Sequence, residues 1–356
     1  MIESHPSHRL HRHTRRDLLK TAAAGSAAAA AALAMGADPL LAAQAARAAA
    51  AAQRSGKPLR AAFSNIGLAV SWCAQGKAAA EHWGRLYNVE VTWFDGQLDL
   101  AKQRDALNQM AAQRWDFVAV QPFAIDALVE PVQKMIDAGI PVIDMDTLIA
   151  PPDKVKVHTF LAPDNEFMGA AVTQALVTRL GGKGKVIETA GALGHTGAQG
   201  RAAGFNKVVK EYPGIEVLDT SAADWDVAKV KQIWEGHLEK YPQIDAAFFH
   251  NDDMALAAFE VIERRGRAGK ILIGGVDAMP PAIAAVTDGR MFATVRNPSS
   301  RTHGYSIVAG VAAAAAGATG GEAPAQPMPR RIVLDSPLVT QANAAGMRWM
   351  QEQFLI

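Results

Sequence analysis

IDAAFFHNDDMALAAFEVIERR, residues 244–265, joins an apolar strand directly to an amphipathic helix. Its first part, Ile244–His250, is largely apolar and ends in a polar turn, which is typical of a strand covered on both faces. The part that follows, Asp253–Arg265, places apolar residues at the three- and four-residue spacing of a helix. A buried strand followed by a helix is the repeating unit of helix-covered parallel sheets, so this stretch predicts the fold class of the chain.

The same unit recurs on both sides of this stretch. Further apolar runs predict strands at Leu59–Ser64, Val89–Phe94, Phe117–Gln121, Pro141–Asp146, Lys185–Thr189, Ile215–Asp219, Ile271–Asp277, Phe292–Val295 and Arg331–Leu334. Helical spacing is clearest at Leu98–Gln113, Asp126–Ala138, Glu166–Leu180 and Asp226–Tyr241. This alternation of strands and helices occurs in two series along the chain, with a boundary between them near His158–Asn165. We therefore expect an α/β protein with two doubly wound parallel-sheet lobes.

The N-terminus resembles an export signal. Thr14-Arg15-Arg16-Asp17-Leu18-Leu19-Lys20 precedes a long alanine-rich run, a pattern typical of twin-arginine signals. Asp38, Pro39 and glycines interrupt the run too often for a stable membrane span. We expect residues 1–50 to be a twin-arginine signal peptide, cleaved at a small-residue site within 42–52, and the mature chain to be periplasmic. The alternative is an alanine-rich tail with a chance arginine pair.

Charge and cysteine content narrow the possible functions. Of 36 Lys/Arg and 35 Asp/Glu, residues 1–50 hold six and three, so the mature chain keeps 30 and 32. This near-neutral balance argues against nucleic acid or an anionic membrane as a partner. Cys73 is the single cysteine, so no intramolecular disulfide can form. Because the histidines lack metal-ligand spacing, and Gly181–Lys185 precedes a strand instead of following one, we expect no metal and no cofactor.

Polar and aromatic residues gather after the predicted strands, where open α/β sheets bind their ligands. They are Ser64, Asn65, Gln121 and Asp146 in the first half, and Gln199, Trp225, Asn251, Asp277 and Asn297 in the second. Carboxylates and amides bind hydroxyl groups, and a tryptophan face covers the C–H side of a sugar ring. No nucleophile–base pair can be placed among these residues. The set therefore suits a polyhydroxylated small molecule.

Several motifs carry a family resemblance. Phe248–Leu256, FFHNDDMAL, resembles the QNDEMALG segment of ribose-type periplasmic sugar-binding proteins. Five more matches stand in the order of that family: Gly139–Asp146, Asp164-Asn165, Arg201–Phe205, Gly275–Asp277 and Ala293–Val295. Each motif is moderately specific, but six in order at matching spacing make a strong signal, which covers roughly residues 58–335.

The resemblance implies the type I periplasmic binding protein fold, in which two similar lobes joined by a three-strand hinge close on a sugar. It divides the chain into residues 58–161 plus 298–327 for the N-terminal lobe and 162–297 plus 328–356 for the C-terminal lobe. It also implies a monomeric receptor that delivers a sugar or polyol to an inner-membrane ABC permease with a cytoplasmic ATPase.

Carried over position by position, the resemblance implies contacts from both lobes. Ser64, Gln121 and Asp146 would contact the ligand from the first lobe, and Trp225, Asn251 and Asp277 from the second. Asn65 adjoins Ser64 at the end of the first strand, Asn165 matches the first crossing, and Asn297 lies near the hinge. Trp72 is either a pocket wall or part of helix packing. We expect Asp252 to cap the following helix or to orient its neighbours.

Three departures from the family pattern bear on the ligand. Thr147 and Gln199 stand where ribose binders have arginines, and Leu68–Trp72 replaces an Asn-Pro-Phe-Phe segment. Because an arginine fork binds hydroxyls in a geometry that these residues cannot copy, we expect the best ligand to differ from ribose.

Two other functions remain open at this point. A sugar-active hydrolase would need two carboxylates flanking one bond, and Asp146 with Asp277 could superficially supply them. A receptor for a chemotaxis or sensor-kinase system would present the same lobes to a different partner. We expect a binding protein without enzymatic activity.

Overall fold

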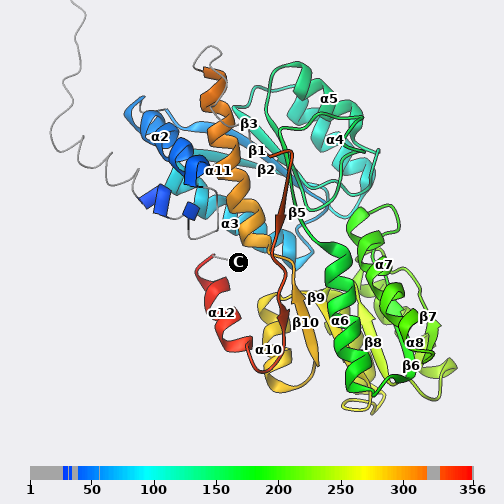
Figure 1. Cartoon of the computed structure of the whole chain (residues 1–356). Helices are drawn as coiled ribbons and strands as arrows, with labels where there is room; N and C mark the ends of the chain where they lie inside the picture. Colours follow the sequence, from blue (N-terminus) through cyan, green and yellow to red (C-terminus); the bar gives the residue numbers. More distant parts are fainter. Residues whose placement is uncertain (1–26, 31, 34–38, 56, 319–328, 355–356) are drawn as a thin grey trace, which may run out of the picture.

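The structure is a computed structural model that describes residues 27–30, 32–33, 39–55, 57–318 and 329–354. The paired arginines of the predicted signal lie outside the described residues. α2 (Pro39–Ser55) begins within the predicted leader and ends beyond it, and this helix lies beside α11 (Ser299–Ala318) in Figure 1. Among the described residues, no helix is long and apolar enough to cross a bilayer.

Two six-stranded sheets form the core of the molecule (Figure 1). The first contains, in spatial order, β11 (Arg331–Leu334), β5 (Thr159–Pro163), β4 (Val142–Met145), β3 (Phe117–Val120), β1 (Leu59–Asn65) and β2 (Val89–Asp95), all parallel. The second contains β12 (Leu338–Val339), β10 (Ala293–Arg296), β9 (Leu272–Asp277), β8 (Ala246–Phe249), β6 (Lys183–Thr189) and β7 (Gly214–Asp219), with only β12 antiparallel. The predicted fold of two doubly wound lobes is confirmed.

Helices cover both faces of the first sheet. On one face, α3 (Ser71–Tyr87) and α11 pack in a cluster that includes Phe63 and Phe117. On the other face, α4 (Leu100–Ala111) and α5 (Val129–Asp137) pack against strand residues such as Val118. Successive strand side chains point to opposite faces, so a sheet covered on both sides requires apolar residues without alternation. This requirement explains the continuous apolar runs in the sequence.

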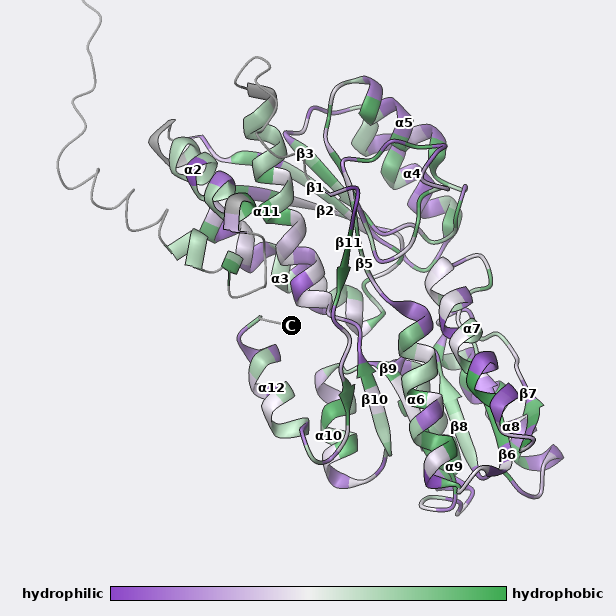
Figure 2. Ribbon diagram, in the orientation of Figure 1, coloured by the Kyte–Doolittle hydropathy of each residue, from purple (hydrophilic) through white to green (hydrophobic). Residues whose placement is uncertain are grey.

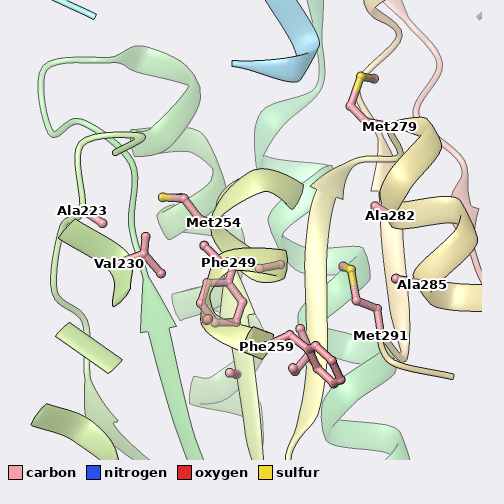
Figure 3. Close-up of a cluster of buried hydrophobic side chains, with 14 of the residues drawn as sticks. Ala223, Val230, Phe249, Met254, Phe259, Met279, Ala282, Ala285 and Met291 are labelled. Atoms are coloured by element: carbon pink, nitrogen blue, oxygen red, sulfur yellow. The ribbon is translucent and has the colours of Figure 1, made fainter. Parts of the chain in front are cut away.

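The second sheet is covered in the same way. α6 (Asn165–Arg179) and α7 (Thr196–Glu211) lie on one face. α8 (Val227–Lys240), α9 (Asp252–Arg264) and α10 (Pro280–Asp288) lie on the other, with α12 (Ala344–Glu352) against α10. Figure 3 shows part of the larger apolar cluster, including Phe249, Met254 and Phe259. In Figure 2 the strands are mostly green, and the hydrophilic purple lies mainly on helices and loops.

Along the described residues, the chain passes between the lobes three times, after β5, after β10 and after β11. The expected assignment of residues 328–356 to the C-terminal lobe is wrong for β11, because Arg331–Leu334 pair in register with Phe160–Pro163 of the first sheet. Only from β12 onward does this last segment belong to the second lobe. The predicted boundary at residues 158–165 contains β5, a strand that the sequence pattern did not predict.

The strand order places a crevice at the same point in each lobe. α3 and α5, which follow β1 and β3, cover opposite faces of the first sheet, and α7 and α9, which follow β6 and β8, do so in the second. Ligands of doubly wound sheets bind at the carboxyl ends of strands where the winding reverses in this way. These two crevices face each other across the lobe boundary.

Candidate ligand-binding site between the lobes

A pocket lies where the carboxyl ends of the two sheets meet. Its lining residues are Ile66, Val70, Trp72, Cys73, Gln121, Asp146, His195, Arg201, Trp225, Asn251, Asp277 and Asn297. They come from the end of β9, from loops and helix starts that follow β1, β3, β4, β6, β7, β8 and β10, and from α3 and α7. The polar members are hydrogen-bonded in two groups, one around Asp146 and one around Arg201.

Asp146 organises the first-lobe side. Its Oδ2 accepts hydrogen bonds from Gln121 Nε2 at 3.0 Å and Thr147 Oγ1 at 3.2 Å, and its Oδ1 accepts one from Asn297 Nδ2 at 3.0 Å. Burial raises the pKa of Asp146, but His195, Arg201 and the amide donors lower it by more, so the net pKa is below its usual value. The side chain therefore presents a buried, well-oriented carboxylate.

Arg201 organises the second-lobe side. Its Nε donates to Asn165 Oδ1 at 3.0 Å, its Nη1 donates to the His250 carbonyl oxygen, and its Nη2 lies 3.7 Å from Asp277 Oδ1. Burial raises the pKa of Asp277 well above its ordinary value, and Arg201 opposes this shift. The Arg201 guanidinium also lies 5.7 Å from the centre of the Trp225 ring. The second lobe thus offers a cation, a carboxyl group and an aromatic face together.

Trp225 and His195 form the inner wall. Their rings meet edge to face with centroids 5.1 Å apart. A Cβ atom on Gly191 would lie 2.1 Å from the Trp225 ring, so only glycine leaves room for the indole here. Burial lowers the pKa of His195 to about 4, although Asp146 opposes this shift, so the imidazole is neutral at pH 7. The wall is therefore apolar in character with uncharged edges.

Two fully buried side-chain atoms of lining residues have no hydrogen-bond partner among the described residues. They are Trp225 Nε1, a donor, and Asn297 Oδ1, an acceptor, and both are buried. An unpaired buried polar atom costs about 1–3 kcal/mol, so a ligand that pairs with it recovers that free energy. A hydroxyl group can serve either atom, because it both donates and accepts.

Helix α9 explains the adjoining polar turn. Asn251 Oδ1 accepts a hydrogen bond from the Met254 backbone at 2.9 Å and so caps the helix. Asp252 is fully buried, and it accepts from Thr294 Oγ1 at 2.7 Å and from the Met279 backbone at 2.9 Å. The predicted orienting role of Asp252 is therefore observed, while the cap itself is Asn251.

Direct contacts hold the lobes together around the pocket. Thr147 Oγ1 of the first lobe lies 2.7 Å from His195 Nε2 of the second. The Leu148 backbone donates to Thr196 Oγ1 at 3.1 Å, and the Ser71 backbone donates to Asp253 Oδ2 at 2.7 Å. The free space left in the pocket is about 20 Å³. This space is close to the size of one water, so a sugar can enter only when the lobes separate.

Most of the residues expected at the site are brought together here. Trp72, Gln121, Asp146, Trp225, Asn251, Asp277 and Asn297 all line the pocket. For Trp72 the structure combines both possibilities, since the residue lies on α3 and its Nε1 donates to the Asn297 carbonyl oxygen at 3.2 Å. Direct ligand contact by these residues remains a prediction.

Four of the expected residues do not line the pocket. Ser64 lies behind it near Gln103, and Asn65 Nδ2 bonds to His303 Nε2 at 3.1 Å. Asn165 acts through Arg201. Gln199 is exposed and donates to the Leu193 carbonyl oxygen at 2.9 Å, so its expected place in the pocket is wrong.

The pocket also contains five residues that were not among those expected there: Ile66, Val70, Cys73, His195 and Arg201. Arg201 had a usable signal, because it belongs to a matched family motif and lies two residues after Gln199. Consecutive helix positions are about 100° apart, so residues 199 and 201 point in nearly opposite directions and only one of them can face the pocket. His195 and the apolar residues carried no comparable signal.

The sequence pattern of the periplasmic binding protein domain matches residues 61–319. Since this span is well over half of the sequence, the chain belongs to the periplasmic binding protein family. The predicted resemblance is therefore confirmed at the family level.

Individual relatives agree with this assignment. The chain is 29% identical over 234 residues to a xylitol-binding protein of Mycolicibacterium smegmatis, and the match covers 64% of this chain and 66% of that protein. It is 30% identical over 235 residues to a ribose import binding protein of Bacillus subtilis, covering 65% and 75% respectively. Among solved structures, the binding component of an arabinose ABC transporter from Shewanella, bound to α- and β-L-arabinofuranose, has a TM-score of 0.73 and 26% identity, covering 83% of this chain and 96% of that one.

Proposed function

We propose that this chain is a periplasmic receptor that closes around a sugar or polyol and delivers it to an ABC importer. The observation that carries the proposal is the pocket at the lobe boundary, where two carboxyl groups, three amides and two tryptophans converge. Hydroxyl groups need such paired donors and acceptors, and a ring or carbon chain needs an aromatic face. The named sugar- and polyol-binding relatives support the same class of ligand.

The ligand that we propose is a polyol or a pentose other than ribose. The support is that Thr147 replaces an arginine of the ribose-type pattern and bonds to His195 and Asp146. A melting-temperature screen of pentoses, hexoses, polyols and cyclitols, followed by calorimetric titration of the hits, tests this directly. We expect one site with a stoichiometry of one. A titration in which ribose binds more tightly than every other pentose and polyol would contradict the proposed specificity.

Hinge closure is the proposed working motion. The support is geometric: the described chain crosses between the lobes at three points, and in the present form the pocket leaves too little space for a sugar to pass in or out unless the lobes separate. Small-angle scattering should show a larger radius of gyration for the ligand-free protein than for the saturated one. Equal radii under both conditions would argue against closure on the ligand.

Export by the twin-arginine route is a proposal that rests on the leader sequence. Arg15→Lys combined with Arg16→Lys should leave the precursor in the cytoplasm, because the paired guanidinium groups are the feature that defines this signal. A matched control is Arg9→Lys combined with Arg12→Lys, which keeps the leader charge and the Arg15-Arg16 pair. Normal maturation of the first variant would exclude this route.

We also propose that the protein binds its ligand without turnover and acts as a monomer. Incubation with candidate glycosides should return them unchanged at a stoichiometry of one ligand per chain. Product release would instead favour the hydrolase, with Asp146 and Asp277 as its carboxylates. Neighbouring genes for a permease and an ATPase would separate the transport role from a sensory one.

A further inference from the structure

A second cavity, of about 300 Å³, lies within the first lobe. It shares no lining residue with the pocket between the lobes. β4, β5 and β11 form its floor, and the segment 148–157 covers it. Leu148, Ile149, Val155 and Phe160 are among the apolar side chains that make up most of its wall.

One buried polar atom in this wall has no partner. Asp144, on β4, is 1% exposed, and its Oδ2 accepts a hydrogen bond from the Ile149 backbone at 3.0 Å. Its Oδ1 is buried and has no hydrogen-bond partner among the described residues. Burial raises the pKa of this carboxyl group well above its usual range, which favours the protonated form. A hydroxyl group would suit this oxygen in either protonation state, since a hydroxyl donates and accepts.

The strands place an aromatic ring and a cation in line with this carboxyl group. Asp144 is paired with Phe160 across β4 and β5, and Phe160 is paired with Arg331 across β5 and β11. Paired residues of a parallel sheet share a face, and all three line the cavity. These three residues form a row across the sheet. Neighbouring strands are about 4.8 Å apart, so the row runs about 10 Å from the carboxyl group to the arginine position.

The outer end of the row is positively charged. Lys156, Arg330 and Arg331 line the cavity there and are exposed, while Asp144 is the single acidic residue of the lining. The Arg330 Nη1 donates to the Val157 carbonyl oxygen at 2.9 Å, which fixes that side chain at the rim. The Arg331 guanidinium lies 6.0 Å from the centre of the Phe160 ring. This end therefore favours an anionic group next to an aromatic one.

We propose that this cavity binds a small aromatic acid that carries a hydroxyl group at the end remote from its acid group. The hydroxyl pairs with Asp144 Oδ1, the ring packs on Phe160 between apolar walls, and the acid group meets Arg330, Arg331 and Lys156. A hydroxyphenyl ring with a short acid chain has its two polar ends about as far apart as the row is long. The site is separate from the proposed sugar site and does not depend on it.

The test is a calorimetric titration of the full chain with three probes of one shape. They are 3-(4-hydroxyphenyl)propionate, 3-phenylpropionate, which lacks the hydroxyl, and tyramine, which lacks the acid. We expect saturable binding of the first at one site, about tenfold weaker binding of the second, and no binding of the third. Because these comparisons use the unmodified protein, they do not depend on the folding of any variant.

Two variants locate the binding. Asp144→Leu should weaken the hydroxylated acid about tenfold and leave 3-phenylpropionate unchanged, because only the former uses the carboxyl oxygen. Arg331→Ala should weaken both acids, whereas Arg348→Ala, an exposed arginine on α12, should weaken neither. No saturable binding of 3-(4-hydroxyphenyl)propionate to the parent would overturn the proposal. Equal binding of all three probes, or equal loss of both acids in Asp144→Leu, would overturn it as well.

Discussion

At the scale of single residues, Asp146 and Asp277 occupy matching positions in the two lobes. Asp146 directly follows β4, and Asp277 ends β9, the corresponding strand of the second sheet. Both have positive φ angles, 60° and 117°, which side-chain-bearing residues rarely adopt. Such backbone strain, of about 1–3 kcal/mol per residue, persists where the surrounding structure enforces it, and it concentrates at functional sites.

The first prediction concerns Asp277. Asp277→Ala should weaken binding of the best sugar or polyol 5- to 150-fold, equivalent to about 1–3 kcal/mol, because hydroxyls sealed in the pocket lose their partner. The free energy of unfolding should change much less, since burial of this carboxyl group is itself unfavourable. Calorimetric titration and urea unfolding measure the two effects. Asp288→Ala, at the exposed end of α10, is the control and should leave affinity unchanged.

The second prediction concerns His303, which is fully buried below the pocket. Its Nδ1 donates to the Ser299 carbonyl oxygen at 2.8 Å, and its Nε2 accepts from Asn65 Nδ2. Burial lowers its pKa from 6.5 to about 4. Between these two pH values the unfolded chain therefore binds a proton that the folded chain does not, and acid destabilises the folded state.

His303→Gln removes this proton linkage. The free energy of unfolding that the substitution costs at pH 7 should shrink by about 3 kcal/mol as the pH falls from 6.5 to 4. Urea unfolding of parent and variant across this range provides the measurement. A difference between the two proteins that stays constant with pH would show that His303 takes up its proton equally in both states.

The residues of the site that stand at strand ends could be predicted from the sequence. Gln121, Asp146, Asn251 and Asp277 follow strands that are legible from apolar runs, and strand ends of parallel sheets converge. His195 and Arg201 reach the pocket from the start of α7, where the direction of a side chain depends on how the helix packs. That packing is a tertiary property, which no local pattern reveals, and only the family motif that begins at Arg201 pointed to that residue.

At the scale of elements, α6 and α7 pack almost backbone to backbone. A Cβ atom on Gly169 would lie 2.1 Å from the Arg201 carbonyl oxygen, and one on Gly204 would lie 2.1 Å from the Glu166 carbonyl oxygen. Only glycines allow this approach. Since Arg201 lies on this contact, the spacing of the two helices also sets the depth of the guanidinium in the pocket.

The third prediction tests this packing. Gly204→Ala should push the helices apart and lower the free energy of unfolding by about 1–3 kcal/mol, with weaker sugar binding because Arg201 moves. Gly236→Ala on α8 is a matched control, since its Cβ atom would meet nothing within 4 Å. That control should be neutral or stabilising by up to about 1 kcal/mol, the usual gain from alanine in a helix. A Gly204→Ala protein as stable as the parent would contradict the close packing.

The sequence pattern did not predict β5, β12 and α7, and each omission has a physical reason. β5 ends in a proline and runs directly into the Asp164 cap of α6, so its five residues resembled a linker. β12 has two residues, too few for any period. α7 contains three glycines, which disfavour an isolated helix, and it gains its stability from contact with α6. The long apolar strands needed no such tertiary help, and they were predicted to within a few residues.

At the scale of the whole molecule, the reactivity of the single cysteine depends on whether the two lobes are open or closed. Cys73 lines the pocket with no exposed surface, and its Sγ lies 3.4 Å from Gln121 Oε1. Burial raises the pKa of its thiol to about 12, so the closed form contains almost no reactive thiolate at neutral pH. Reaction with a thiol reagent therefore requires the lobes to open.

The fourth prediction uses this thiol. A saturating sugar should slow labelling of Cys73 at least about tenfold, because ligand binding removes the open form from the population. Thr147→Val should speed labelling of the ligand-free protein about fivefold, the effect of one lost hydrogen bond to His195. Protein unfolded in urea should react at once in every case. Identical labelling rates with and without sugar would show that the pocket does not open and close around its ligand.

The hydrogen bonds from Thr147, Leu148 and Ser71 across the lobe boundary are made by the protein alone. In a receptor that works as proposed, they affect both its sensitivity and its waste. Stronger bonds raise the share of empty receptors that are already closed, and because a sugar enters only when the lobes separate, they weaken apparent affinity. The same empty, closed receptors would dock on the permease and trigger ATP hydrolysis with nothing to carry. Selection on these three contacts would then act on the background energy consumption of the whole transporter, and scarce nutrients would favour a different strength from abundant ones.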